Sequence, residues 1–255
     1  MRLRQALIPA AVAAALTAGC SPFGIVNHAG PATSTSTTAP TTPSGTVPVT
    51  PTPSHPTNGM EFKPAAEVES LAKKALLGAS SVRIKGTVHE NGETIALDMH
   101  LKGTDGSTGT ITQNGTDMHL LIIGKVAYIS GDDTFWSKTV GKGAVATLRG
   151  KYLKMTSSNP DFKDLLVFGS VTKLAAMFLP DEPLIRIGQQ PVNGSRTLIL
   201  KGAGDTYFVA LDGPPYPLRL SGGDSKTSAV IDFLDYGKPV TLTAPPKSKI
   251  FSVPS

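Results

Sequence analysis

The chain has 255 residues, of which 40% are hydrophobic and 17% are charged. This composition is too apolar for a disordered chain, and the length allows one domain, with or without a small second one. Lysine and arginine outnumber aspartate and glutamate by 24 to 19, an excess too small and too scattered to indicate nucleic-acid binding. The single cysteine, Cys20, excludes an internal disulfide, a thiolate metal cluster and a cysteine nucleophile in the folded part.

Residues 1–19 have the pattern of a secretory signal peptide. Arg2 and Arg4 precede an apolar stretch over residues 6–16, and small residues follow before Cys20. The stretch is shorter than the roughly 20 residues that a membrane-spanning helix needs. Removal of this segment leaves 22 basic and 19 acidic residues, a net charge of about +3.

The end of the signal, Leu16-Thr17-Ala18-Gly19-Cys20, resembles a bacterial lipobox, with Thr17 where leucine is usual. The resemblance implies that Cys20 becomes the diacylglyceryl-modified, palmitate-carrying N-terminus of a lipoprotein on the outer face of the cell membrane. Two acyl chains are enough for stable anchoring, whereas one chain binds only marginally. The alternative is a plain signal peptide with a cysteine near its cut site by chance.

Residues 20–63 are expected to form a linker between this anchor and the folded domain. They are mostly proline, threonine, serine and alanine, and 9 of the 21 prolines lie between Ser21 and Pro64. A flexible coil of this length reaches on the order of 35 Å, and proline stiffens it further. We therefore expect a tether that holds the domain off the membrane.

The folded domain is expected over residues 64–248, followed by a tail at 249–255. Pro64 opens a helix that ends at Gly78, and its apolar residues recur at helical spacing as Val68, Leu71, Ala75 and Leu76. A second helical stretch starts at Asn159-Pro160 and continues from a cap at Ser170 to Pro180.

Alternating apolar and polar residues predict two series of β-strands on either side of the second helical stretch. Asn91-Gly92, Asp105-Gly106 and Asn114-Gly115 are hairpin signals that make the first series an antiparallel meander. The expected strands span residues 82–90, 94–102, 108–113, 118–123, 126–130, 184–189, 197–201, 206–211, 217–221, 229–235 and 240–243. About eleven strands with few helices predict an α+β fold, in which a large curved antiparallel sheet, or half-barrel, wraps around helices.

Element order and the chain's ending resemble the mycobacterial LppX/LprG lipoprotein family over about Ala65 to Ser248. The resemblance is carried by Leu77-Gly78-Ala79-Ser80-Ser81-Val82, by Val126-Ala127-Tyr128-Ile129 before Phe135-Trp136, and by Phe233-Leu234-Asp235-Tyr236-Gly237-Lys238-Pro239-Val240 before Ala244-Pro245-Pro246. It implies the half-barrel of the LolA, LolB and RseB proteins. It also implies that the helices close a cavity that holds the acyl chains of an amphipathic lipid or glycolipid.

The candidate lipid-binding residues combine an apolar wall with an apolar cover. The wall comes from the second and fourth strands, and the cover comes from the helical insertion. The wall and cover residues are Leu97, Met99, Leu101, Met118, Leu120, Ile122, Phe162, Leu166, Leu174 and Phe178. A filled core explains the same pattern from the residues alone, and only the family resemblance favours a cavity.

Catalytic and cofactor signals are weak. The sequence lacks Gly-x-Ser-x-Gly, Walker A and His-Glu-x-x-His motifs, and Gly141 to Ala146 fits G-x-G-x-x-A without a βαβ frame. Asp98-Met99-His100 and Asp117-Met118-His119 place a carboxylate and an imidazole on one strand face, as a divalent metal requires. We interpret the first motif as a loop and the second as solvent-facing polar positions, and expect no enzyme activity, cofactor or metal.

The sequence therefore predicts an exported, Cys20-anchored envelope lipoprotein that binds an amphipathic lipid or lipoglycan and assists its transport or localisation. The alternative is an envelope sensor or interaction module with a filled core, a protein partner and no lipid cargo. A hydrolase is a weaker third reading, because it would need a cluster of His, Ser and Asp side chains that the strand pattern does not require.

Overall fold

The computed structural model describes residues 56–90, 92–156, 165–178, 183–223 and 227–252. Residues from Thr57 onward form one compact unit. In the described part of the chain, no helix combines the length and the hydropathy that a bilayer crossing requires. Cys20, the linker up to residue 55 and Phe162 lie outside the described residues, as do the side chains of Leu166 and Phe178.

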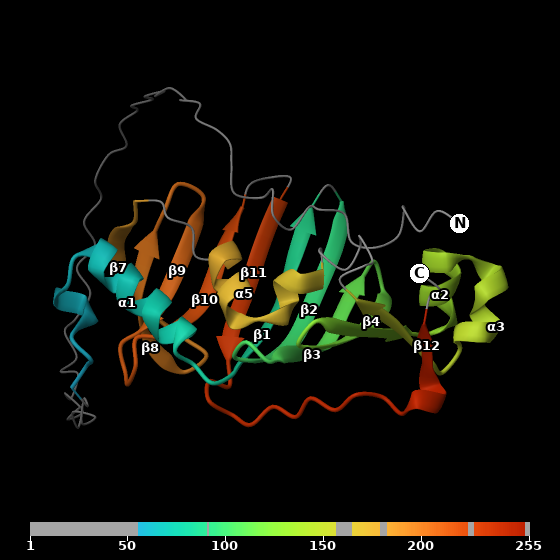
Figure 1. Ribbon diagram of the computed structural model, residues 1–255. Helices are drawn as coiled ribbons and strands as arrows, with labels where there is room; N and C mark the ends of the chain where they lie inside the picture. The colour runs from blue at the N-terminus through green and yellow to red at the C-terminus, as the bar shows by residue number, and fades with distance from the viewer. Residues whose placement is uncertain (1–55, 91, 157–164, 179–182, 224–226, 253–255) are drawn as a thin grey trace, which may run out of the picture. The chain divides into compact units, whose positions relative to one another are not determined.

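One mixed sheet of twelve strands organises this unit (Figure 1). Its spatial order is β12-β6-β5-β4-β3-β2-β1-β11-β10-β9-β8-β7, so the sheet is open, with β12 and β7 at its edges. The predicted α+β half-barrel is confirmed. The strands are β1 (Val82–Glu90), β2 (Glu93–Lys102), β3 (Gly106–Gln113), β4 (Thr116–Ile123), β5 (Val126–Gly131), β6 (Tyr152–Thr156), β7 (Ile185–Val192), β8 (Ser195–Lys201), β9 (Asp205–Ala210), β10 (Pro217–Gly223), β11 (Thr227–Leu234) and β12 (Ile250–Ser252).

The helical segments are short. They are η2 (Met60–Phe62), α1 (Ala65–Leu77), α2 (Asp133–Val140), η3 (Lys142–Ala144), α3 (Val145–Leu148), η4 (Leu166–Gly169), α5 (Val171–Phe178) and η5 (Lys247–Lys249). Figure 1 shows α1 and α5 on the same side of the sheet, where α1 contacts β10 and α5. Among the described elements, η2 lies before the predicted domain range 64–248 and β12 lies after it.

Two antiparallel meanders meet in the middle of the sheet. Strands β1 to β6 form one and β7 to β11 the other, and β1 pairs antiparallel with β11. The hairpin between β3 and β4 turns at Asn114 and Gly115, whose φ angles are 49° and 74°. These left-handed values match the type I′ turn that an Asn-Gly pair favours.

The two predicted helices are present, and their ends follow the expected signals. Helix α1 ends at Gly78, and the side chains it buries are Val68, Ala72 and Leu76. The Ser170 hydroxyl accepts a hydrogen bond from the Lys173 backbone N–H at 3.2 Å, as an N-cap does. The Val171 N–H donates to the Gly103 carbonyl at 3.0 Å, which ties the start of α5 to the turn between β2 and β3.

Several expected elements are wrong at the end of the first meander and near the C-terminus. Helix α2 was not predicted, and Asp132 caps it by accepting a hydrogen bond from the Phe135 N–H at 2.7 Å. Strands β6 and β12 were not predicted, and β12 pairs parallel with β6, so the sheet is not wholly antiparallel. The expected strand at 240–243 is not one.

Residues 239–246, which we call the strap, run from the end of β11 to η5 and β12 along the sheet (Figure 1). Pro239, Pro245 and Pro246 have no N–H to donate to a strand ladder. At its start, the Ser81 hydroxyl donates to the Lys238 carbonyl at 2.6 Å, and the Gly237 N–H donates to the Ser81 carbonyl at 3.1 Å. At its end, β12 holds the chain beside β6.

Gly109 of β3 lies at a closely packed point near the centre of the sheet. A Cβ added there would lie 2.7 Å from the Met99 sulfur and 2.2 Å from the Asp98 carbonyl oxygen. Overpacking of this kind costs about 1 to 3 kcal/mol, and we expect Gly109→Ala to lower the free energy of unfolding in urea by that amount. Gly143→Ala, with nothing within 4 Å of its added Cβ, should not lower it. Equal midpoints for the two variants would contradict the close contact.

Candidate functional site

We call the side of the sheet on which α1, η4 and α5 pack the inner face, and this face is apolar across its centre. One row of directly paired residues crosses seven strands from β11 to β6, and two parallel rows flank it on β2, β3 and β4. The central row is Phe233, Ile84, Met99, Gly109, Leu120, Ile129 and Leu153. Each apolar side chain in it is at most 4% exposed.

The six wall residues predicted from the sequence all lie on this inner face. Leu97 and Met118 are joined through Ile111 of β3, and Leu101 and Ile122 are joined through Ser107. Met99 and Leu120 belong to the central row. All six are at most 5% exposed, so the alternation of side chains in β2 and β4 placed them on the same face. That they bind lipid stays a prediction.

The cover over the wall consists of η4, α5 and α2. Segment η4 lies against β2, β3 and β4, and α5 packs beside α1. Leu174, a predicted cover residue, is fully buried, and its neighbours Val171 and Ala175 are at most 2% exposed. The other predicted cover residues cannot be placed, because Phe162 and the side chains of Leu166 and Phe178 lie outside the described part.

Helix α2 covers the far end of the inner face, and its role was missed from the sequence. The Phe135 ring fills the space that a side chain at Gly131 of β5 would need. Trp136 is fully buried beside it, with ring centroids 4.8 Å apart in an edge-to-face arrangement. Asp132, an N-cap residue type directly before this aromatic pair, is the signal that could have revealed the helix.

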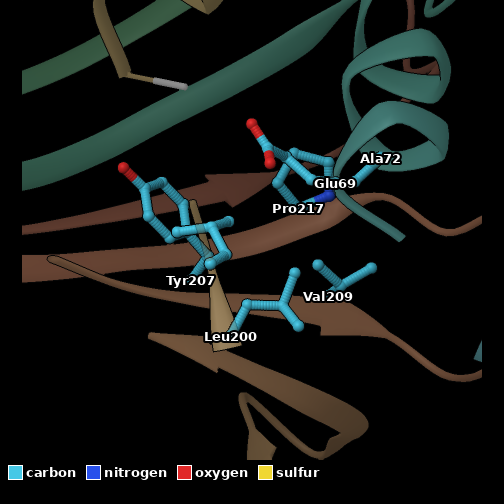
Figure 2. Close-up of a pocket in the computed structure, with 7 residues that line it drawn as sticks. Glu69, Ala72, Leu200, Tyr207, Val209 and Pro217 are labelled. Carbon is cyan, nitrogen blue, oxygen red and sulfur yellow. The ribbon is translucent and has the colours of Figure 1, made fainter. Parts of the chain in front are cut away.

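The inner face has a small pocket beneath α1. Figure 2 shows a pocket between Ala72 of α1 and Leu200, Tyr207 and Val209 on the strands below it. Its volume is about 10 Å³, the smallest size that accepts one water molecule. Gly86 and Gly109, which interrupt the apolar rows, are covered by Ile231 and Met99. In this conformation the pocket under α1 is too small for an acyl chain.

Two buried polar atoms stand out in this apolar environment. The Ser107 hydroxyl, in the inner-face row between Leu101 and Ile122, and the Trp136 indole N–H have no hydrogen-bond partner among the described residues. Both side chains are fully buried. An unsatisfied buried polar group costs about 1 to 3 kcal/mol, so each is a place where a water molecule or a ligand oxygen would stabilise the protein.

Several charged side chains around β1 form ion pairs on the opposite, outer face. Arg83 donates to Asp98 through Nε at 2.7 Å and Nη2 at 2.6 Å, and these hydrogen bonds lower the pKa of Asp98 below its usual range. The hydrogen bond from Lys238 likewise lowers the pKa of Asp235. Burial raises the pKa of Tyr236, whose hydroxyl donates to the Pro217 carbonyl at 2.6 Å.

The two Asp-x-His pairs lie on the outer face with β3 between them. The Asp98 carboxylate accepts hydrogen bonds from Arg83, and the Asp117 carboxylate accepts one from the Thr112 hydroxyl at 2.6 Å. His119 Nδ1 lies 3.0 Å from the Thr110 hydroxyl oxygen. Among the described residues, no three His, Cys, Asp or Glu side chains are grouped as a metal site requires.

The glycine-rich match at residues 141–146 is helical and not an open loop. It spans η3 and the start of α3, and α2 precedes it. A dinucleotide-binding turn joins a strand directly to a helix within a βαβ unit, and this segment lacks that arrangement.

Solved structures resemble this fold at low sequence identity, whereas no family model and no curated protein matches the chain. LprF from Mycobacterium bovis is 15% identical with a TM-score of 0.49, covering 71% of this chain and 98% of its own. LppX from Mycobacterium tuberculosis is 14% identical with a TM-score of 0.45, and the match covers 70% of this chain and 100% of LppX. In the MucA/MucB complex of Pseudomonas aeruginosa, the matching chain is 13% identical with a TM-score of 0.34, and the match covers 72% of this chain and 59% of that chain. At these values the likeness assigns no function to this chain.

The hydrogen bonds that Asp98, Asp117 and His119 already form lead to a prediction about metal binding. We expect calorimetric titration of the protein with zinc to show only weak binding to surface groups, because the carboxylates and one imidazole already have partners. The variants His100→Ala and His119→Ala should give the same heats as the wild type. A one-to-one site with submicromolar affinity that both variants abolish would refute this.

Proposed function

We propose that this chain is an exported, Cys20-anchored envelope lipoprotein whose inner face binds the acyl chains of an amphipathic lipid or lipoglycan and assists its transport or localisation. The observation that carries the proposal is the apolar inner face covered by short helical segments. A second sheet would seal such a face permanently, whereas η4 and α5 are short segments at its centre. No reaction is part of this proposal.

The energetics require extensive contact between ligand and protein. Each methylene group moved from a membrane to water costs about 0.8 kcal/mol, so a lipid with ~30 methylenes needs on the order of 25 kcal/mol of replacement contacts. A volume of about 10 Å³ under α1 supplies none of this. Because Met99, Leu120 and Ile122 are at most 1% exposed, acyl chains reach them only when η4, which lies against β2 to β4, moves away.

The buried polar atoms support a ligand at the inner face. The Ser107 hydroxyl and the Trp136 N–H can each donate a hydrogen bond to a carbonyl oxygen. Acyl esters carry such oxygens at the junction between their chains and their headgroup. A bound lipid would thus satisfy groups that have no partner in the present conformation.

A second candidate function is an envelope sensor or interaction module with a filled core. The small pocket and the complete burial of Met99 and Ile122 favour it. In that case the inner face serves only stability and a protein partner binds elsewhere. The two functions differ in how the wall responds to added bulk.

Adjacent leucines in β4 provide this test, because Leu120 lies on the inner face and Leu121 on the outer face. For a lipid carrier, we expect Leu120→Trp to lose bound lipid with little change in melting temperature, because η4, which lies over β4, then moves to admit the larger ring. In a filled core it would cost about 1 to 3 kcal/mol through strain. Lipid content is measured by native mass spectrometry of protein purified from bacterial membranes. The control Leu121→Trp should keep its lipid, and a lipid-free wild type with an unfolded Leu120→Trp would support the interaction module.

The membrane anchor is tested by Cys20→Ala in a host that acylates lipoproteins. We expect the variant to leave the membrane fraction and the detergent phase, because an unmodified chain lacks the two acyl chains that give stable anchoring. The wild-type protein, processed in parallel, should stay in both. Equal partitioning of the two proteins would show that Cys20 is not the anchor.

A further inference from the structure

We infer that the outer face of β3 to β6, beneath the strap, is a binding groove for a neutral oligosaccharide. An open groove of about 480 Å³ lies between this face and strap residues Thr241 and Thr243. Small-molecule sites typically measure roughly 300 to 1,000 Å³. The groove is on the opposite side of the sheet from the inner face, so this inference is independent of lipid binding.

The floor of the groove is a row of polar side chains aligned by the strand register. Thr110 of β3 pairs with His119 of β4, which pairs with Ser130 of β5. Because Ile129 pairs with Leu153, Tyr152 of β6 is the next member of the row. Neighbouring strands are about 4.8 Å apart. The floor therefore presents a hydroxyl, an imidazole, a second hydroxyl and a phenol ring at regular intervals.

The strap forms the other wall and leaves its backbone available. Its start is held at Ser81 and its end by the pairing of β12 with β6. Between these points, none of the backbone hydrogen bonds among the described residues involves the N–H or C=O of residues 240–245. Thr241 and Thr243 are exposed, whereas Leu242 lies against Gly106 of β3. The strap is thus fixed by its ends and by Leu242, while its polar atoms keep their hydrogen-bonding capacity.

The charge of the lining identifies the class of ligand. None of the residues that line the groove is Asp, Glu, Lys or Arg, and nearby Asp98 and Asp117 already have partners. A strongly charged ligand would find no counter-charge in the lining. A sugar offers hydroxyl groups that both donate and accept, as Thr, Ser and Tyr do. Its C–H faces can pack on the Tyr152 ring and on Leu121, which are apolar surfaces in the same groove.

The inference is tested by nuclear magnetic resonance on the ¹⁵N-labelled full chain carrying Cys20→Ala. The probes are α-1,6-mannohexaose, cellohexaose and chitohexaose, with inorganic phosphate as the anionic comparison. We expect at least one hexasaccharide to shift the amide signals of residues 240–243 and of β3 to β5, with saturation below about 5 mM. Phosphate should not shift them.

Two tryptophan variants on the outer face separate groove binding from general surface binding. Thr110→Trp fills the floor and is expected to weaken the affinity about tenfold or more, whereas Thr87→Trp, a matched half-buried position on β1, should stay within about twofold of the wild type. Thr243→Val removes only an exposed strap hydroxyl and should weaken binding even if Thr110→Trp does not fold.

Three outcomes would overturn the inference. The first is that no hexasaccharide shifts these signals. The second is that phosphate alone shifts them, which would indicate an anion site at His119. The third is sugar binding that Thr110→Trp and Thr243→Val leave at wild-type affinity, because the sugar would then lie outside the groove.

Discussion

The structure depends on the burial of one apolar sheet face by very little helical material. The twelve strands share one inner face, and burial of its side chains at roughly 25 cal/mol per Å² is the main favourable term in folding. The helical segments α1, η4 and α2 contact its strands, and α5 packs between α1 and η4. Because the cover is made of short helices from different parts of the chain, its segments can differ in how firmly they are held.

Successive side chains of a β-strand point to opposite faces of the sheet, so one strand contributes residues to both the inner and the outer face. In β4, Met118, Leu120 and Ile122 point inward and are buried, while His119 and Leu121 point outward. A shift of one residue in pairing would exchange these sets. The Asn114-Gly115 turn fixes the register between β3 and β4, and so fixes which residues meet the helices and which meet the strap.

Much of the fold could be predicted from the sequence because local signals agreed with the final structure. The hairpin turns and the alternation in β1 to β5 gave these strands nearly correct bounds, and helix α1 ends at the Gly78 stop. The errors arose where a distant contact decides the structure. Residues 240–243 alternate as a strand does but lie between prolines and follow the sheet as a strap, and three-residue β12 forms only because β6 is beside it.

The candidate site was predictable only in part, for a related reason. The pattern of β2 and β4 identifies the wall, but burial alone does not separate a packed core from a closed binding site. Ser107 and Gly109 on β3 are small residues whose position in the wall depends on pairing with β2 and β4. The groove under the strap required a segment far along the chain, Thr241 to Thr243, to be placed over β3 to β5.

The seam between β1 and β11 has a consequence for how the chain folds. Each meander consists of strands that follow one another closely, so its contacts form early and quickly. The seam instead joins Arg83 to Leu234, from opposite ends of the domain, and such long-range pairings slow folding because loop closure precedes the gain from contact. During synthesis, which starts at the N-terminus, strands β1 to β6 are made before β11. Until β11 is present, β1 has an unpaired edge, and an unpaired strand edge is a site at which newly made molecules can pair with one another and aggregate.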